Sequence, residues 1–311
     1  MEPRFGWDRE PPAKRTRHRH REQTSDDEGA ASEGGFVIGY VTDSSSQITS
    51  ELADRYRVEV VPTGITIDGE DHLEGVDLDT DDFYAAFGRG VTPTVSTSAP
   101  TPGELLSAYE RLVARGCEEI ISVHVGSQHS ATLEAARLAA RRIEVPVRLV
   151  DTGVASFGVT CCLWEAARAR EAGASVDDTV AVAETTAARL ASVFVLMGTE
   201  LADAGGRYGS LVEGASMPVI RTRGPEMDVL AEVGSGDEAV EVMTDAVLSD
   251  GPGLIAAVGL ADLPSRPLTN EFASALERDR RVEQVIRYRV GPSVGAHTGP
   301  GTLGGFHFVP A

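Results

Sequence analysis

Residues 101–151, TPGELLSAYERLVARGCEEIISVHVGSQHSATLEAARLAARRIEVPVRLVD, carry the pattern that decides the fold. Their first part is typical of a helix, because Thr101 can cap it, Pro102 suits its first position and Glu104 completes a capping box. A glycine at position 116 then ends that helix. The segments that follow predict a buried strand at 118–125, a helix at 132–142 and a strand at 145–151.

The same alternation continues on both sides of this stretch. Upstream we expect a strand at 36–43, a helix at 49–56, a strand at 58–67, a polar loop at 68–82 and a helix at 83–87. Downstream we expect helices at 156–171 and 175–190, a hairpin of 218–223 with 228–233, helices at 237–248 and 270–278, and strands at 253–260 and 283–290. Strands that alternate with helices favour a mostly parallel sheet with helices on both faces.

These elements predict two α/β domains. The first, residues 36–192, has the mostly parallel sheet; the second, residues 193–311, has a mixed sheet with helices. Residues 1–35 have few apolar side chains and are predicted to be a disordered tail. The basic run that begins at Lys14 within this tail is most simply a solvated segment.

Charge and composition exclude several classes of protein. The formal charge is −20, and residues outside the tail include 21 basic against 40 acidic side chains, which argues against nucleic acid as a partner. Lys14 is the one lysine in the sequence, so the folded part cannot supply a P-loop or a Schiff-base lysine. The sequence has no apolar run long enough to span a membrane and no secretory signal, so we expect a cytoplasmic protein.

The three cysteines form no disulfide or metal framework. Cys161 and Cys162 are adjacent in an apolar run, which indicates buried small side chains rather than a redox pair. His124 and His129 lack a third partner at ligand spacing, so we expect no metal and no cofactor.

Small hydroxyl side chains, glycines and histidine gather in four predicted loops at 42–46, 96–101, 126–130 and 291–305. In an open parallel sheet, loops at the strand ends cluster where ligands bind. Hydroxyls and helix N-termini, with Ser130 as a predicted N-cap, can hold a carboxylate without a basic side chain. His297 lies in the last of these loops, among six glycines and two prolines. A histidine there can donate a hydrogen bond to an anion or act as an acid or base.

Five motifs resemble those of the DegV family, in the family's order. They are VTDSSSQI, PTVSTSAPTPGELLSAYERL, VHVGSQHSATLEAARLAA, AGGRYGSL and VGAHTGPGTLG. The resemblance extends from about Phe36 to the C-terminus. It implies two α/β domains with a long-chain fatty acid between them, and an acyl-carrier role in which the acid is presented to a separate fatty-acid kinase.

The resemblance also implies the residues that bind the fatty-acid carboxylate. Carried over by motif, they are Thr97, Ser98, Ser127, Ser130 and His297. Arg207, in the Gly-Gly-Arg motif, is a candidate for docking to a partner. The sequence departs from the family pattern at several positions near the head group, namely Ala99, Gly126, His129 and Ala131.

Two other hypotheses remain open. Ser98 or Ser130 with His297 could make an acyl or ester hydrolase, although neither serine lies in a Gly-x-Ser-x-Gly nucleophile elbow. An Asp43, Ser44 and His297 triad meets the same objection. Alternatively, the basic tail could be the working part of a regulatory interaction protein.

Overall fold

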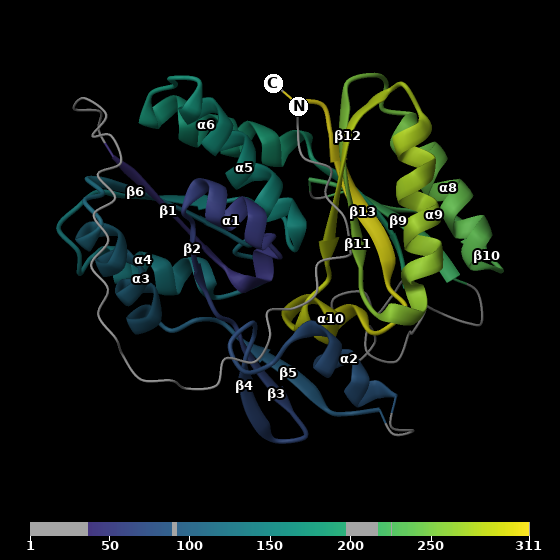
Figure 1. Ribbon diagram of the computed structural model, residues 1–311, viewed down its shortest axis with the longest axis horizontal. Helices are drawn as coiled ribbons and strands as arrows, with labels where there is room; N and C mark the ends of the chain where they lie inside the picture. Colours follow the sequence, from purple (N-terminus) through teal and green to yellow (C-terminus); the bar gives the residue numbers. More distant parts are fainter. Residues whose placement is uncertain (1–36, 89–91, 197–216, 225, 311) are drawn as a thin grey trace, which may run out of the picture.

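The computed structural model describes residues 37–88, 92–196, 217–224 and 226–310. Within these ranges the chain forms three sheets: a four-stranded sheet, a six-stranded sheet and a three-stranded sheet. The two larger sheets lie side by side, and the smallest lies beneath them (Figure 1). The fold class predicted from the sequence, a parallel α/β unit followed by a mixed α/β unit, is confirmed.

The four-stranded sheet is entirely parallel and has the order β2-β1-β6-β7. Side chains of β1 alternate between two cores, Tyr40 in one and Val41 in the other, as the pleat requires. Helices α3 and α4 cover the Val41 side, whereas α1, α5 and α6 cover the Tyr40 side (Figure 1). The bounds are β1 Ile38–Asp43, β2 Glu59–Val61, β6 Glu119–His124, β7 Val147–Asp151, α1 Ser50–Tyr56, α3 Pro102–Ala114, α4 Thr132–Ala140, α5 Phe157–Glu171 and α6 Val176–Arg189.

The six-stranded sheet is mixed, with the order β10-β9-β8-β13-β11-β12. The predicted hairpin is present as the antiparallel pair β9 and β10. Helices α8 and α9 pack on one face of the sheet, and the other face meets α5 through a stack of Phe157 on Tyr288 with ring centroids 4.4 Å apart. The bounds are β8 Ala191–Val195, β9 Met217–Arg223, β10 Glu226–Val233, β11 Leu254–Leu260, β12 Val282–Arg289, β13 Leu303–Phe308, α8 Gly236–Leu248 and α9 Arg266–Arg278.

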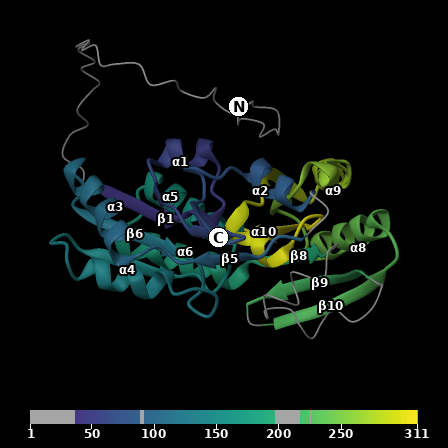
Figure 2. The same cartoon turned by 90° about the horizontal axis from the view of Figure 1, so that it is seen from below.

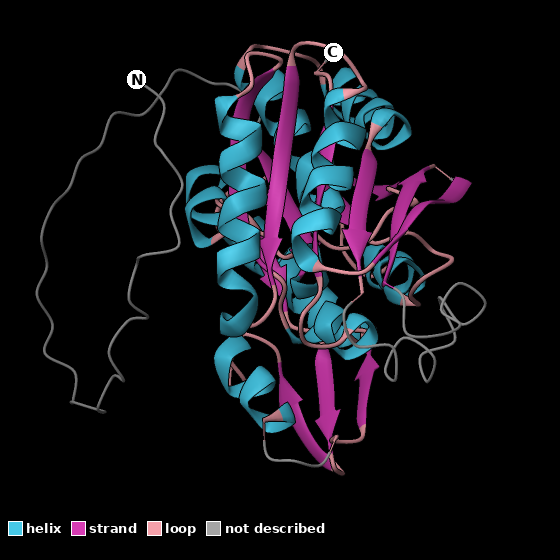
Figure 3. Ribbon diagram, turned by 90° about the vertical axis from the view of Figure 1, so that its right-hand side faces the viewer, coloured by secondary structure: helices cyan, strands magenta, loops and turns pink. Residues whose placement is uncertain are grey.

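The three-stranded sheet is antiparallel and was not predicted. It pairs β3 (Gly64–Ile67) with β4 (Glu70–Leu73) and β5 (Val95–Ser98), and α2 (Thr80–Phe87) accompanies it. Figure 3 shows this sheet at the lower end of the molecule, away from the layered bulk.

The single strand predicted at 58–67 is wrong, because the chain changes sheets within it. Pro62 lies between β2 and β3, and a proline cannot donate to a strand ladder. The polar loop predicted at 68–82 contains β4, whose first two side chains are exposed and so give no apolar alternation. The predicted loop at 96–101 begins inside β5.

The segment 291–305 is not one loop either. It contains a short helix, α10 (Pro292–Thr298), and the start of β13, the strand between β8 and β11. Its glycines hide both elements in the sequence. Gly305 has a packing reason, because a Cβ there would run into the backbone carbonyl of Ala257. Viewed from below, α10 lies between the two larger sheets (Figure 2).

A buried polar network fixes α10 against the N-terminal part of the chain. The Glu74 carboxylate accepts hydrogen bonds from Ser44 Oγ at 2.6 Å and from the Ser293 backbone N–H at 3.1 Å. Gln47 Nε2 donates to Ser293 Oγ at 3.1 Å, and the Gln47 carbonyl oxygen accepts from the Gly291 N–H. Burial raises the pKa of Glu74 above its ordinary value of 4.5.

We predict that Glu74→Gln reduces the pH dependence of stability. Because the folded-state pKa of Glu74 is raised, the folded protein holds this proton after the unfolded chain has lost it. The free energy of unfolding therefore falls as pH rises from about 4.5 through the raised pKa, and glutamine removes this contribution. Urea unfolding between pH 4.5 and 8 measures the effect. Glu70→Gln, at an exposed position on β4, is the control, and parallel curves for wild type and Glu74→Gln would refute the prediction.

Candidate functional site

A small polar cavity of about 80 Å³ collects side chains from six separate segments. We call it the hydroxyl pocket. It lies where η1 (Ser44–Ser46), β5, α10 and the segments before β3, α4 and α5 meet. Its polar members are Ser45, Thr63, Thr97, Ser98, His129, Ser130, Thr132, Ser156, Ser293, His297 and Thr298.

Thr97 and His297 meet directly in this pocket. Thr97 Oγ1 on β5 and His297 Nε2 on α10 are 3.1 Å apart, although 200 positions separate them in the sequence. The expectation that His297 lies in a loop is wrong, since it is on the last turn of α10. Pro292 starts that helix, and Gly299 with φ of 77° follows its end, a conformation that favours glycine.

The other predicted residues divide between the pocket and its surroundings. Ser98 and Ser130 line the pocket, whereas Ser127 does not; Ser127 is exposed, and its N–H donates to Asp151 Oδ1 at 3.1 Å. Ser130 is not the N-cap of α4, because Ala131 holds that position. The Ser130 hydroxyl instead accepts from the Thr132 N–H at 3.2 Å. Arg207 lies outside the described residues.

Six hydroxyl residues of the pocket were not among the predicted site residues, namely Ser45, Thr63, Thr132, Ser156, Ser293 and Thr298. Thr63 is 6% exposed, and its Oγ1 has no hydrogen-bond partner among the described residues. Ser156 precedes α5 with φ of 55°, which is uncommon for a residue other than glycine. Ser293 lies within α10. The one available signal was Pro62, which marks the break in the strand just before Thr63.

A larger cavity of about 640 Å³ adjoins the hydroxyl pocket. It lies between the start of α5 and the open face of the six-stranded sheet, and its size is typical of small-molecule sites. The two cavities share His129, Ala155, Ser156, Val294 and Thr298. Its apolar members include Leu190, Phe194, Met227, Tyr288, Val290 and Phe306. The hydroxyl pocket is thus mainly polar, and the cavity beside it has a large apolar surface together with polar members such as Gln128, Thr222 and Glu226.

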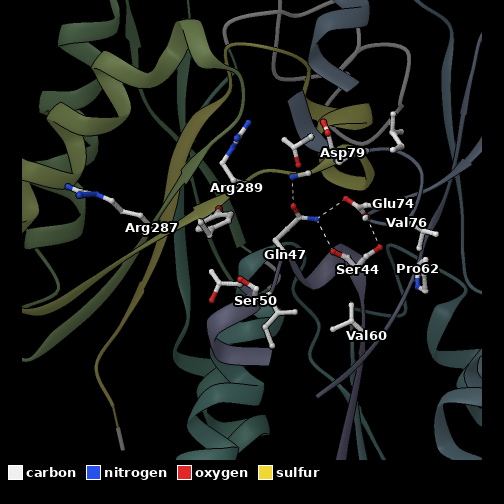
Figure 4. A pocket seen from close by; sticks show the side chains of 18 residues that line it. Ser44, Gln47, Ser50, Val60, Pro62, Glu74, Val76, Asp79, Arg287 and Arg289 are labelled. Carbon is white, nitrogen blue, oxygen red and sulfur yellow. Dashed lines mark hydrogen bonds between the residues drawn. The ribbon is translucent and has the colours of Figure 1, made fainter. Parts of the chain in front are cut away.

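A third cavity of about 610 Å³ lies on the other side of the Glu74 network (Figure 4). The figure shows Gln47 and Glu74 converging with Ser44 at its wall. Two arginines that line it are engaged in ion pairs, Arg287 with Glu277 at 3.0 Å and Arg289 with Asp81 at 2.7 Å. Because Ser44, Gln47 and Glu74 line this cavity while Ser293 lines the hydroxyl pocket, the Glu74 network lies between the two.

Two other candidate chemistries receive no support from the geometry. Asp43 Oδ2 is 2.8 Å from His124 Nδ1 and both side chains are fully buried, so Asp43 pairs with this histidine rather than orienting His297. Ser44 donates to Glu74. Within the described ranges, no group of His, Cys, Asp and Glu side chains could hold a metal ion.

The cysteines are buried, and none forms a disulfide among the described residues. Burial raises the pKa of Cys162 to about 12 and that of Cys161 well above the ordinary value, so both thiols are poor nucleophiles. The predicted structural role of this pair agrees with these surroundings. In the part of the chain that the structure describes, no helix is long and apolar enough to cross a membrane.

The fold and cavities together define a class: a protein of two α/β units with a polar pocket beside a larger and more apolar cavity. The family model described as uncharacterised proteins of the DegV family matches residues 37–309. The chain therefore belongs to the DegV family. The DegV domain-containing protein SCO2569 of Streptomyces coelicolor is 29% identical over 274 residues, which cover 86% of this chain and 96% of that protein.

Solved structures have the same fold. A fatty-acid-binding DegV family protein from Thermus thermophilus superposes with a TM-score of 0.78 at 24% identity, covering 88% of this chain and 99% of the other. DegV from Bacillus subtilis, described as a fatty acid binding protein, gives 0.78 at 21% identity, covering 88% and 100%. A DegV family protein from Ruminococcus gnavus, described with vaccenic acid, gives 0.76 at 18% identity, covering 88% and 100%.

We predict that Val294→Trp fills the junction of the two cavities. An anilinonaphthalene sulfonate dye, which fluoresces in apolar surroundings, should bind about tenfold more weakly, because the indole occupies apolar surface that the dye would cover. Val113→Trp is the matched control, since Val113 is 37% exposed on α3, away from both cavities. Equal dye titrations for the two variants, each with native circular dichroism, would contradict the assignment of the cavity.

Proposed function

We propose that this protein binds one long-chain fatty acid, with the carboxyl group in the hydroxyl pocket and the acyl chain in the adjoining apolar cavity. The observation that carries the proposal is that the two cavities adjoin, since five residues line both of them. Solved DegV relatives described as fatty-acid-binding proteins support the same ligand class. Each buried methylene contributes about 0.8 kcal/mol, so a long chain needs few polar contacts.

We propose Thr97, Ser98, Ser130 and His297 as contacts of the carboxyl group. All four line the hydroxyl pocket, and the Thr97–His297 hydrogen bond keeps the imidazole at its wall. Thr63 joins this set because its buried hydroxyl needs a partner. We do not propose Ser127 as a contact of the carboxyl group, since its side chain is exposed and does not line the pocket.

The protein acts as a non-catalytic acyl carrier in this proposal. It would hold the fatty acid or its acyl phosphate without a cofactor and present it to a partner fatty-acid kinase in the cytoplasm. The family resemblance is the support for the kinase partner, with Arg207 as the candidate docking residue. Thr97 Oγ1 contacts His297 Nε2 at 3.1 Å, and a threonine in this position favours binding over hydrolysis.

Mass spectrometry of the purified protein tests the proposal directly. Under native conditions we expect one acyl chain per protein, released as a free fatty acid on solvent extraction. A protein that is purified empty and also fails to bind added palmitate or oleate would refute the proposal. Turnover of p-nitrophenyl esters that is lost in Ser98→Ala or Ser130→Ala would instead favour the hydrolase hypothesis.

Single substitutions test the assignment of the head group. We predict that His297→Ala and Thr97→Ala each weaken binding of palmitate about three- to tenfold, the equivalent of one hydrogen bond, and weaken binding of methyl palmitate less. Ser127→Ala should leave both affinities unchanged. Isothermal titration with delipidated protein measures all of these values. Equal losses for the acid and the ester would contradict the proposed carboxyl contacts.

A further inference from the structure

One hydroxyl of the pocket has a fixed orientation. Asp43 Oδ1 accepts the backbone N–H of Ser45 at 3.1 Å and also contacts Ser45 Oγ. Because Asp43 Oδ1 accepts hydrogen bonds from Ser45, a proton on this carboxyl group would lie on the other oxygen, Oδ2, toward His124. The Ser45 O–H therefore donates to Asp43 Oδ1.

The orientation of Asp43 is itself held by a buried chain of hydrogen bonds. Asp43 Oδ2 lies 2.8 Å from His124 Nδ1, and His124 Nε2 lies 2.7 Å from Ser122 Oγ. Ser122 Oγ in turn lies 2.9 Å from the hydroxyl of Tyr109. All four side chains are fully buried. Because the proton of Ser45 is used by this chain, the Ser45 oxygen offers only lone pairs to the hydroxyl pocket.

The remaining charges around the pocket do not favour an anion strongly. Among the described residues that line it there is no arginine or lysine, and the two titratable side chains are His129 and His297. The titratable groups behind the lining are Asp43 with His124, behind Ser45, and Glu74, which contacts Ser293. A carboxylate that enters this pocket loses water and meets no guanidinium or ammonium group of the described residues, which disfavours its ionised form.

A donor for a carbonyl oxygen is available at the same place. The buried Thr63 hydroxyl has no partner among the described residues, so its proton is left to donate. The Ser293 hydroxyl accepts from Gln47 Nε2, and its side chain also hydrogen bonds to the Glu74 carboxyl group, which uses its proton. The pocket thus offers a fixed acceptor at Ser45 and a hydroxyl donor at Thr63.

We propose that the pocket binds the fatty acid as a neutral carboxylic acid, with the acid O–H donating to Ser45 Oγ and the acid carbonyl accepting from Thr63. This inference rests on the proposed function and specifies the ionisation state of its ligand. Ser45 and, behind it, Asp43 then select the protonated head group. A free aliphatic carboxyl group loses its proton at about pH 4 to 5, so binding weakens as pH rises above that range until the pKa of the bound acid is reached.

Carbon-13 NMR of palmitate labelled at the carboxyl carbon tests the ionisation state. With the full-length protein loaded at one equivalent, the bound signal should keep the chemical shift of a protonated acid well above pH 5 and titrate at least about two pH units above the free acid. A bound signal that has the shift of the carboxylate ion at every pH from 5 to 9 overturns this inference and leaves the proposed function intact. The absence of any bound signal would instead refute the proposed function.

Variants of η1 test the role of Ser45. Ser45→Ala should lower the pKa of the bound acid and weaken palmitate binding about three- to tenfold at pH 6, with little effect on methyl palmitate, which has no proton to donate. Ser45→Thr, which keeps the hydroxyl, should restore both values. Ser46→Ala is the matched control, because Ser46 is a neighbour in η1 whose buried hydroxyl does not line the pocket. An unchanged titration of the bound acid in Ser45→Ala would overturn the role of Ser45.

Discussion

The position of α10 depends on a carboxyl group that is buried and hydrogen bonded rather than paired with a cation. Glu74 accepts from Ser44 and from the backbone of Ser293, and Gln47 spans the same junction. These contacts bring residues 44–74 and residues 291–293 together, and His297 follows one turn later on the same helix. The hydroxyl pocket therefore depends on a polar junction that fixes segments from the N-terminal and C-terminal halves of the chain relative to each other. A network of this kind is costly when one partner is missing, which makes it a strict constraint on the geometry.

The elements with strong periodicity could be predicted from the sequence. The capped helix that begins at Pro102 and the hairpin of β9 and β10 are present close to their expected bounds. The failures have particular physical causes. The start of β4 is exposed, so it lacks an apolar pattern, and β13 contains two glycines whose purpose is close backbone packing, which only the partner strands reveal.

The candidate site was predicted in part for related reasons. Family motifs pointed to Thr97 and His297, and these two side chains meet in the structure. Thr63 has only the preceding Pro62 as a local signal and Ser293 only its glycine-rich segment, and a single hydroxyl beside proline or glycine is typical of any turn or helix start. Ser127 differs from these residues: it lies in a motif that resembles the family's, but its side chain is exposed and does not line the pocket. Spatial convergence of distant segments is the information that a single sequence does not contain.

The order of strands in the six-stranded sheet affects when the apolar cavity can exist. β13 separates β8 from β11, and Leu303 pairs with Val195, 108 positions earlier. On the ribosome, β8 can pair early with β9 but must wait for all of this intervening chain before β13, its other neighbour, is available, whereas the parallel sheet of residues 38–151 can close sooner. During that interval the apolar side of α5 lacks the sheet that covers it. A ligand that fills the cavity would then favour the last step of folding, so that loading and completion of the fold become one event.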